Sequence, residues 1–523
     1  MTVQALTATS QVITVSLKKN VIANYLGQGW RALLGLVFIP LYIRYLGIEA
    51  YGLIAIFAVL QTWLALVEMG MMPALSREMA RFTGGAHDAQ SIRDLLRTIE
   101  LIDIGIAGAI ALSVWAASGW LASNWLRPEN LSVGVAAEAF AVMGAITGLR
   151  FIENIYLSSI VGLQRQVLQN AIISIMATVR ALGAVGVLAW VSPTIKAFFL
   201  WQGLSSLITV AVLAVAVYTT LPSCPKPAKF SLSAFRGMWH FSAGMAAISF
   251  LTVLLTQVDK ILLARLLTLE GFAHYALAGV MSGALYMLIS PITSVYYPRF
   301  TELATRGDTV ALRASYHQCA QIVTVLMGAA AVVLMLFSDI VLRLWTGDPA
   351  LARQVAPLLA VLALGTLFNG LMMTPYHLQL AHGWTTLEIK IDIVSVAVLV
   401  PTVLWVVPKY GAIGAAWVWV ALNASSLMIV IPLMHKFLLT TEKWHWYGQD
   451  VAIPLAATGA TVLLCRALMP DDLGKLGTFS VIFLSSVCAL GIGALSAPTV
   501  RHQISLLVQR SISAVVMRAV KAR

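Results

Sequence analysis

Long apolar runs recur along the whole chain and are separated by short polar segments. Each run has about 20 residues, and a helix of that length crosses a hydrocarbon core of about 30 Å. Backbone polar groups cannot face lipid unpaired, and the runs are much longer than the strands of a membrane barrel, so the pattern predicts helices. The predicted spans lie near residues 20–42, 51–72, 99–118, 132–158, 168–190, 197–220, 238–262, 271–296, 318–342, 355–378, 387–407, 411–434, 449–468 and 477–497. We therefore expect an all-α polytopic membrane protein with about 14 transmembrane helices.

Similar segments recur in the chain at an offset of about 220 residues. Arg44 aligns with Arg265, and Glu49 aligns with Glu270. Further matches continue in register over about 180 residues, and such internal repeats are common in transporters. The repeat predicts two pseudo-symmetric six-helix lobes in the same orientation, followed by a C-terminal helix pair outside the repeat.

The repeat also gives the expected domain boundaries. They are an N-terminal lobe at 1–221, a C-terminal lobe at 222–440, an extra helix pair at 441–500 and a basic tail at 501–523. In this topology one side of the membrane carries about twice as many Lys and Arg residues as the other, which identifies it as cytoplasmic. Both termini are therefore expected in the cytoplasm.

The composition agrees with a chain that lies mostly in lipid. Of the 523 residues, 59% are hydrophobic and only 11% are charged, and the mean hydropathy is +0.86. About a quarter of the residues in a soluble domain are charged. The net charge of +12 follows from basic cytoplasmic loops, which attract anionic headgroups. Membrane lipids, and no nucleic acid, are the expected partners of this charge.

Sequence motifs of enzymes are absent. The chain has no HExxH motif, no P-loop and no GxSxG motif, and its four cysteines form no CxxC pair. We therefore expect a protein with no catalytic residues, no cofactor and no metal. If it is a transporter, its energy must come from elsewhere, and protons or sodium ions are the candidate coupling ions.

A resemblance to a known family rests on the first predicted spans. The residues that carry it are "IP" at 39–40, "RYLG" at 44–47, "YGL" at 51–53, "EMG" at 68–70 and "SRE" at 76–78. This segment resembles the opening of the Wzx-type polysaccharide flippases of the multidrug/oligosaccharidyl-lipid/polysaccharide exporter superfamily. The resemblance implies transport of undecaprenyl-pyrophosphate-linked oligosaccharide across the bacterial inner membrane, from the cytoplasmic to the periplasmic leaflet. It also implies alternating access between two lobes and cooperation with polysaccharide polymerase machinery.

Three arginines, Arg31, Arg150 and Arg180, lie inside predicted spans. A charge at the bilayer centre costs roughly 2.5–3.5 kcal/mol on insertion scales, so such residues face the bundle interior. Guanidinium groups bind phosphate oxygens through two donors and stay protonated. With the pyrophosphate substrate that the resemblance implies, we interpret all three as substrate-binding residues. For Arg150, pairing with Glu153 three residues away is an equally good explanation.

Carboxylates within or near the spans are candidates for ion coupling, because a buried carboxylate can exchange a proton. Glu68, Glu153 and Asp259 are the candidates, although Asp259 adjoins Lys260 near the expected periplasmic boundary. Three other functions fit parts of the pattern. They are a multidrug or cation antiporter of the same fold, a peptidoglycan-precursor flippase, and a membrane-embedded glycosyltransferase or polymerase. The arginines disfavour the antiporter, and the short periplasmic loops disfavour the enzymes.

Overall fold

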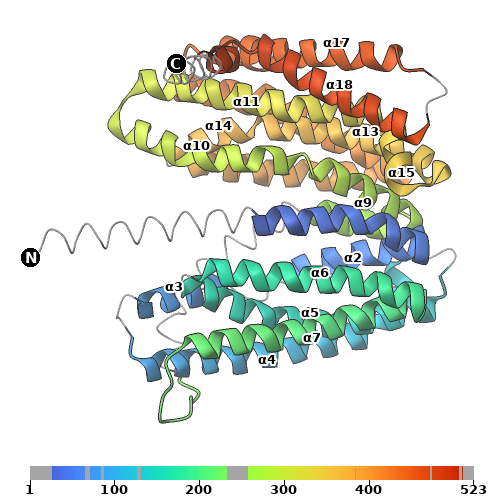
Figure 1. The fold of residues 1–523 in the computed structure, drawn as a ribbon, viewed down its shortest axis with the longest axis vertical. Coiled ribbons are helices and arrows are strands. Elements are labelled where there is room, and N and C mark those ends of the chain that lie inside the picture. Colours follow the sequence, from blue (N-terminus) through green and yellow to red (C-terminus); the bar gives the residue numbers. More distant parts are fainter. Residues whose placement is uncertain are drawn as a thin grey trace, which may run out of the picture. The chain divides into compact units, whose positions relative to one another are not determined.

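The computed structural model describes residues 26–64, 71–83, 87–126, 131–163, 165–232, 257–382, 384–470, 474–505 and 509. All regular secondary structure in these ranges is helical, which confirms the all-α class. The chain divides into two compact units between residues 273 and 274 (Figure 1).

The first unit contains all three arginines that the sequence places inside predicted spans. Its helices are Leu26–Leu46, α2 (Ile48–Leu64), α3 (Met71–Thr83), α4 (Ala89–Trp120), η2 (Leu121–Trp125), α5 (Val133–Gly162), α6 (Gln166–Trp190), α7 (Ile195–Thr220) and the segment 257–266. The long helices begin at polar caps, because the side chains of Asp88, Ser132 and Thr194 accept hydrogen bonds from the first turns of α4, α5 and α7.

Glycines allow α4 and α5 to approach closely. A Cβ atom on Gly144 would lie 2.7 Å from the Val114 Cβ, and one on Gly148 would lie 2.9 Å from the Ala107 carbonyl oxygen. Both distances are shorter than any side chain tolerates, so the small residues fix the α4–α5 contact. Helix α5 also packs against α6 and α7, which places it at the centre of the unit (Figure 1).

The second unit is built around α11. Its helices are α9 (Leu269–Gly283, which begins in the first unit), α10 (Tyr286–Arg306), α11 (Thr309–Leu336), α12 (Ser338–Thr346), α13 (Pro349–Leu371), α14 (Met373–Ala381), α15 (Thr385–Phe437), α16 (Lys443–His445), η3 (Trp446–Ala452), α17 (Ile453–Ala467) and α18 (Lys475–Ser496). The α10, α13, α17 and α18 helices all contact α11. At Gly411 α15 is kinked by a positive φ of 61°, so it consists of two helices, as the spans 387–407 and 411–434 predicted.

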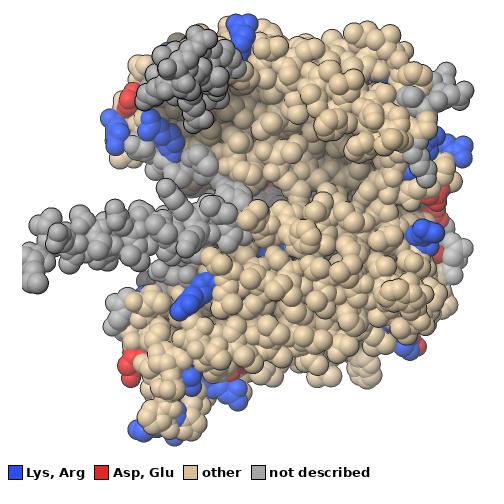
Figure 2. Space-filling view, in the orientation of Figure 1, with Lys and Arg blue, Asp and Glu red and all other residues tan. Residues whose placement is uncertain are grey.

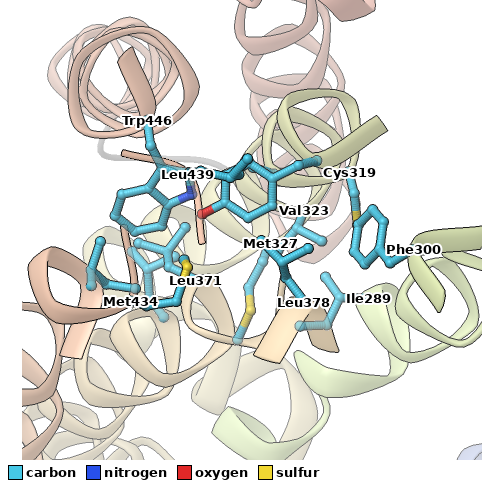
Figure 3. Packing of buried hydrophobic residues seen from close by; sticks show 14 of the residues in the cluster. Ile289, Phe300, Cys319, Val323, Met327, Leu371, Leu378, Met434, Leu439 and Trp446 are labelled. Atoms are coloured by element: carbon cyan, nitrogen blue, oxygen red, sulfur yellow. The ribbon is translucent and has the colours of Figure 1, made fainter. Parts of the chain in front are cut away.

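A large apolar core holds α10, α11, α13 and α14 together in the second unit. Trp446, Phe300 and Met327 are almost fully buried in it, together with Ile289 and Leu378 (Figure 3). Between helices that lie in lipid, such close packing stabilises the fold mainly through van der Waals contacts. The indole of Trp446 brings the short η3 segment into this core and so fixes the chain between α15 and α17.

Eleven helices in the described ranges are long and apolar enough to cross a membrane. One of them, Ile389–Phe437, contains the Gly411 kink, and the shorter apolar helix Ile48–Trp63 precedes residues outside the described ranges. Charged atoms on the face shown in Figure 2 lie mainly toward the helix ends of each unit, and the surface over the helix middles is mostly uncharged. The chain is therefore a multi-pass membrane protein. The predicted span at 238–262 lies largely outside the described residues.

A packing test follows from the contact between α6 and α7. A Cβ atom on Gly183 would lie only 2.0 Å from the Trp201 ring. We expect Gly183→Ala to lower stability by roughly 1–3 kcal/mol, because the indole must move out of its site. Thermal unfolding of the purified protein in detergent measures this loss. Gly186→Ala in the same helix is the control, since its Cβ would meet Trp190 at an ordinary 3.5 Å. An equal loss in both variants would contradict the expectation.

Candidate substrate-binding site

Arg150 and Glu153 lie one helical turn apart on α5 and form an ion pair. The Arg150 Nη1 lies 3.1 Å from the Glu153 Oε2. The Glu153 side chain is only 5% exposed, so its charge sits inside the first unit. The pairing that the spacing predicted is therefore confirmed, and a carboxylate in this position orients the guanidinium.

Arg180 reaches the same carboxylate from the next helix, α6. Its Nη2 lies 3.4 Å from the Glu153 Oε1 and 3.4 Å from the Thr209 Oγ1 on α7. Trp201 fixes the backbone at this position, because its Nε1 donates to the Arg180 carbonyl oxygen over 3.0 Å. No acidic residue lies within four positions of Arg180 in the sequence, but the fold supplies one from α5.

This arrangement has a surplus of positive charge. Two guanidinium groups share the single carboxylate of Glu153, so the three side chains carry a net charge of about +1. The Nε atoms of Arg150 and Arg180 are buried and have no hydrogen-bond partner within the described part of the chain. Both side chains remain partly exposed, at 28% and 17%. The site therefore has donors and charge available for an anionic group.

Arg31 lies on the helix Leu26–Leu46, which packs along α6. Leu34 and Phe38 of this helix form a small core with Ala181, and the Trp30 Nε1 donates to the Thr178 Oγ1 over 2.8 Å. Arg31 itself is half-buried and forms no ion pair or hydrogen bond with any residue that the structure describes. The structure thus joins Arg150 and Arg180 at one carboxylate and brings the helix of Arg31 alongside α6.

The structure describes two of the three residues that were predicted to couple ions. Glu153 is the shared partner of Arg150 and Arg180, as described above. Glu68 lies outside the described residues. Asp259 is on the helical segment 257–266 and forms no ion pair with those arginines or with Arg31, although all four side chains are described. The roles of all three in ion coupling stay predictions.

A polar stripe on α7 was not predicted from the sequence. Gln202, Ser205, Ser206 and Thr209 are all buried, and Thr209 is the residue that Arg180 contacts. These positions recur at helical spacing in an otherwise apolar span, and this spacing is the signal of a polar face turned toward the protein interior.

A second buried carboxylate in the first unit was also missed. Glu100 on α4 accepts hydrogen bonds from Tyr156 at 3.0 Å and Tyr218 at 2.9 Å, and its other oxygen lies 3.1 Å from the Arg97 Nη1. Glu100 is 2% exposed. This network ties α4, α5 and α7 together through three donors, so it satisfies its own charge and leaves no surplus.

Comparison with known proteins identifies the family. The model of the family described as "Polysaccharide biosynthesis protein" matches residues 17–304, which is more than half of the chain. The chain belongs to this family. It is 20% identical over 410 residues to the "Putative O-antigen transporter" of Shigella flexneri, and the match covers 77% of this chain and 94% of that protein.

Solved structures show the same fold. Lipid II flippase MurJ in an inward closed conformation aligns with a TM-score of 0.66 at 12% identity, over 90% of this chain and 98% of that chain. An inward-facing multidrug resistance MATE family transporter aligns with a TM-score of 0.59 at 14% identity, over 79% and 96%. The family model confirms the resemblance found in the first spans, and the chain shares its fold with these transporters.

The shared carboxylate gives a stability test. Glu153→Gln leaves two guanidinium groups without a counter-charge, and breaking a buried pair costs on the order of 3 kcal/mol. We therefore expect a clear fall in thermal stability, measured in detergent micelles. Glu138→Gln is the matched control, because Glu138 forms an exposed pair with Lys196 that contributes roughly 0–1 kcal/mol. Equal stability of the two variants would show that Glu153 does not compensate the arginines.

Proposed function

We propose that this protein is a flippase that moves undecaprenyl-pyrophosphate-linked oligosaccharide from the cytoplasmic to the periplasmic leaflet. The product would supply surface polysaccharide such as O-antigen, capsule or exopolysaccharide. The family and the Shigella flexneri relative support a polysaccharide-related substrate. The observation that carries the proposal is the surplus guanidinium charge at Glu153, inside the helices of the first unit.

The chemistry of the substrate matches this surplus. A pyrophosphate carries negative charge and is strongly hydrated, so it crosses hydrocarbon only if fixed donors replace its water. Arg150 and Arg180 have partly exposed side chains, and a guanidinium group can bind phosphate oxygens through two donors. Arg31, on the adjacent helix, is the third proposed substrate ligand.

The transport cycle is proposed by analogy with transporters built from repeats. In such proteins the substrate site lies near the middle of the membrane, and rocking of the repeats exposes it to each side in turn. We assign fourteen spans, lobes at 1–221 and 222–440, a helix pair at 441–500 and both termini in the bacterial cytoplasm on the basis of the sequence. The spans, the lobes and the position of the termini are part of the proposed function.

Glu153 is the best-supported candidate for ion coupling. Its two oxygens contact different arginines, so protonation of the carboxylate would release both guanidinium groups toward the substrate. A proton on Glu153 and the anionic substrate would therefore bind together, and loss of the proton would return the guanidinium groups to the carboxylate. Glu68 and Asp259 stay in the proposal as further candidates, and a sodium ion is the alternative coupling ion.

A second candidate function is export of drugs or other cations, since a MATE family transporter shares the fold. Cation export requires an interior with surplus negative charge. In the described part of the first unit, the buried Glu100 is already satisfied by Arg97 and two tyrosines, and the Glu153 site is net positive. At these two sites electrostatics thus favours an anionic substrate, and the fully buried Asp103 on α4 is a further carboxylate of this unit.

Export by arginine variants tests the proposal. We expect Arg150→Ala and Arg180→Ala to lower surface polysaccharide about tenfold or more, because each charge-assisted hydrogen bond contributes about 1.5–3 kcal/mol. Surface polysaccharide in a strain that depends on this protein is measured on gels, and protein abundance in the membrane is measured by immunoblot. Arg150→Lys and Arg180→Lys keep the charge and should retain partial export.

Lys196→Ala is the matched control, since Lys196 pairs with an exposed carboxylate in the same unit. It should export normally. Full export by both alanine variants at normal abundance would contradict the proposed substrate site. Loss of export in the Lys196→Ala strain as well would show that the assay reports general damage to the unit.

A further inference from the structure

A second cluster of chemically active side chains lies in the second unit and shares no residue with the proposed transport site. His317 on α11, His445 on α16 and Asp450 on η3 each offer one ligand atom, and these atoms lie within 4.8 Å of one another. The Asp450 side chain is fully buried and that of His317 is nearly so, whereas His445 is 39% exposed. The cluster is therefore built into the protein and open to solvent on the His445 side.

We propose that His317, His445 and Asp450 bind a divalent transition-metal ion, with Zn²⁺ the best match. Two imidazoles and one carboxylate form a ligand set typical of zinc sites that keep a position for water. The set is too rich in nitrogen for Mg²⁺ or Ca²⁺, which prefer oxygen ligands. The site is independent of the proposed function.

Neighbouring side chains contact His317 and Asp450 in the way that second groups commonly hold metal ligands in place. The Nδ1 of His317 faces an Asp450 oxygen, and its Nε2 lies 3.1 Å from the Glu442 Oε2. A histidine that binds metal through one nitrogen commonly donates its other N–H to a carboxylate. Gln321 donates to the Asp450 Oδ1 over 2.8 Å and so orients the second ligand.

The position of His445 distinguishes this proposal from a simpler one. A protonated His317 could bridge Asp450 and Glu442 without any metal, but that arrangement gives His445 no role. The His445 Nε2 is 3.9 Å from the Asp450 Oδ1, which is too long for a hydrogen bond, and its ring centroid is 4.3 Å from that of His317. An ion between the three side chains accounts for their convergence.

The charges nearby are compatible with a divalent ion. Glu442 is balanced by Arg313, whose Nε lies 3.0 Å from the Glu442 Oε1. Asp450 is then the one buried carboxylate of this group whose charge is not already matched by an arginine. A bound cation would compensate it in the protein interior, where an unpaired charge is costly.

The site would connect three parts of the second unit. His317 belongs to α11, and His445 and Asp450 belong to the segment between α15 and α17. Gln321, which orients Asp450, also accepts a hydrogen bond from the Thr499 backbone over 2.8 Å, just after α18. Metal binding would therefore anchor the C-terminal helices on α11 and raise their resistance to unfolding.

Metal binding to the full-length protein tests this inference. The protein is purified in detergent with an affinity tag that contains no histidine, stripped with chelator and titrated with Co²⁺, followed by displacement with Zn²⁺. We expect one ion per chain, visible d–d absorption of bound Co²⁺ and a higher midpoint of thermal unfolding with Zn²⁺. His445→Ala should weaken binding at least about tenfold while the elution profile stays unchanged, because His445 is partly exposed.

His502→Ala is the matched control, because His502 is an exposed histidine of the same unit and should not affect binding. Asp450→Asn should abolish the Co²⁺ absorption. The inference is overturned if the wild-type protein binds no Co²⁺ in stoichiometric amount. It is equally overturned if His445→Ala binds as tightly as the wild type, or if His502→Ala weakens binding as much as His445→Ala does.

Discussion

The net charge of the site formed by Arg150 and Arg180 depends on one buried carboxylate. Glu153 receives a guanidinium from its own helix and another from α6, and a single negative charge neutralises only one of them. A membrane interior offers little water for the remaining charge, so a surplus there is costly unless a ligand supplies the missing anion. The helices α5, α6 and α7, with their caps and close contacts, hold the site in the geometry that creates this surplus.

One polar contact between helices of the second unit is neutral, in contrast to the charged site at Glu153. In the second unit, Tyr286 donates to Asn369 over 2.7 Å, and Asn369 donates to Asn423 over 2.8 Å. These groups are neutral and satisfy one another, so they stabilise helix contacts without creating a field. The cationic character found at Glu153 comes from Arg150 on α5 and Arg180 on α6.

The sequence predicted the features that depend on neighbours along one helix. Apolar runs gave the helices, and the spacing of Arg150 and Glu153 gave their ion pair. Contacts between helices could not be predicted this way, because periodicity reports which face a residue occupies and not what that face meets. The pairing of Arg180 with Glu153 spans 27 residues, and that of His317 with Asp450 spans 133. Neither pairing can be predicted from the sequence, because each depends on how separate helices pack.

The ion pairs at Glu153 do not argue against a role in binding. A flexible arginine loses about 1.5–2 kcal/mol of side-chain entropy when it is fixed on a ligand, whereas one already held by a carboxylate has lost much of that freedom. Glu153 thus competes with an anionic substrate for charge but also orients both guanidinium groups toward it. A transporter must release what it binds. A site whose guanidinium donors can return to an internal carboxylate releases an anion more easily than a site with no such carboxylate, so the arrangement at Glu153 suits transport.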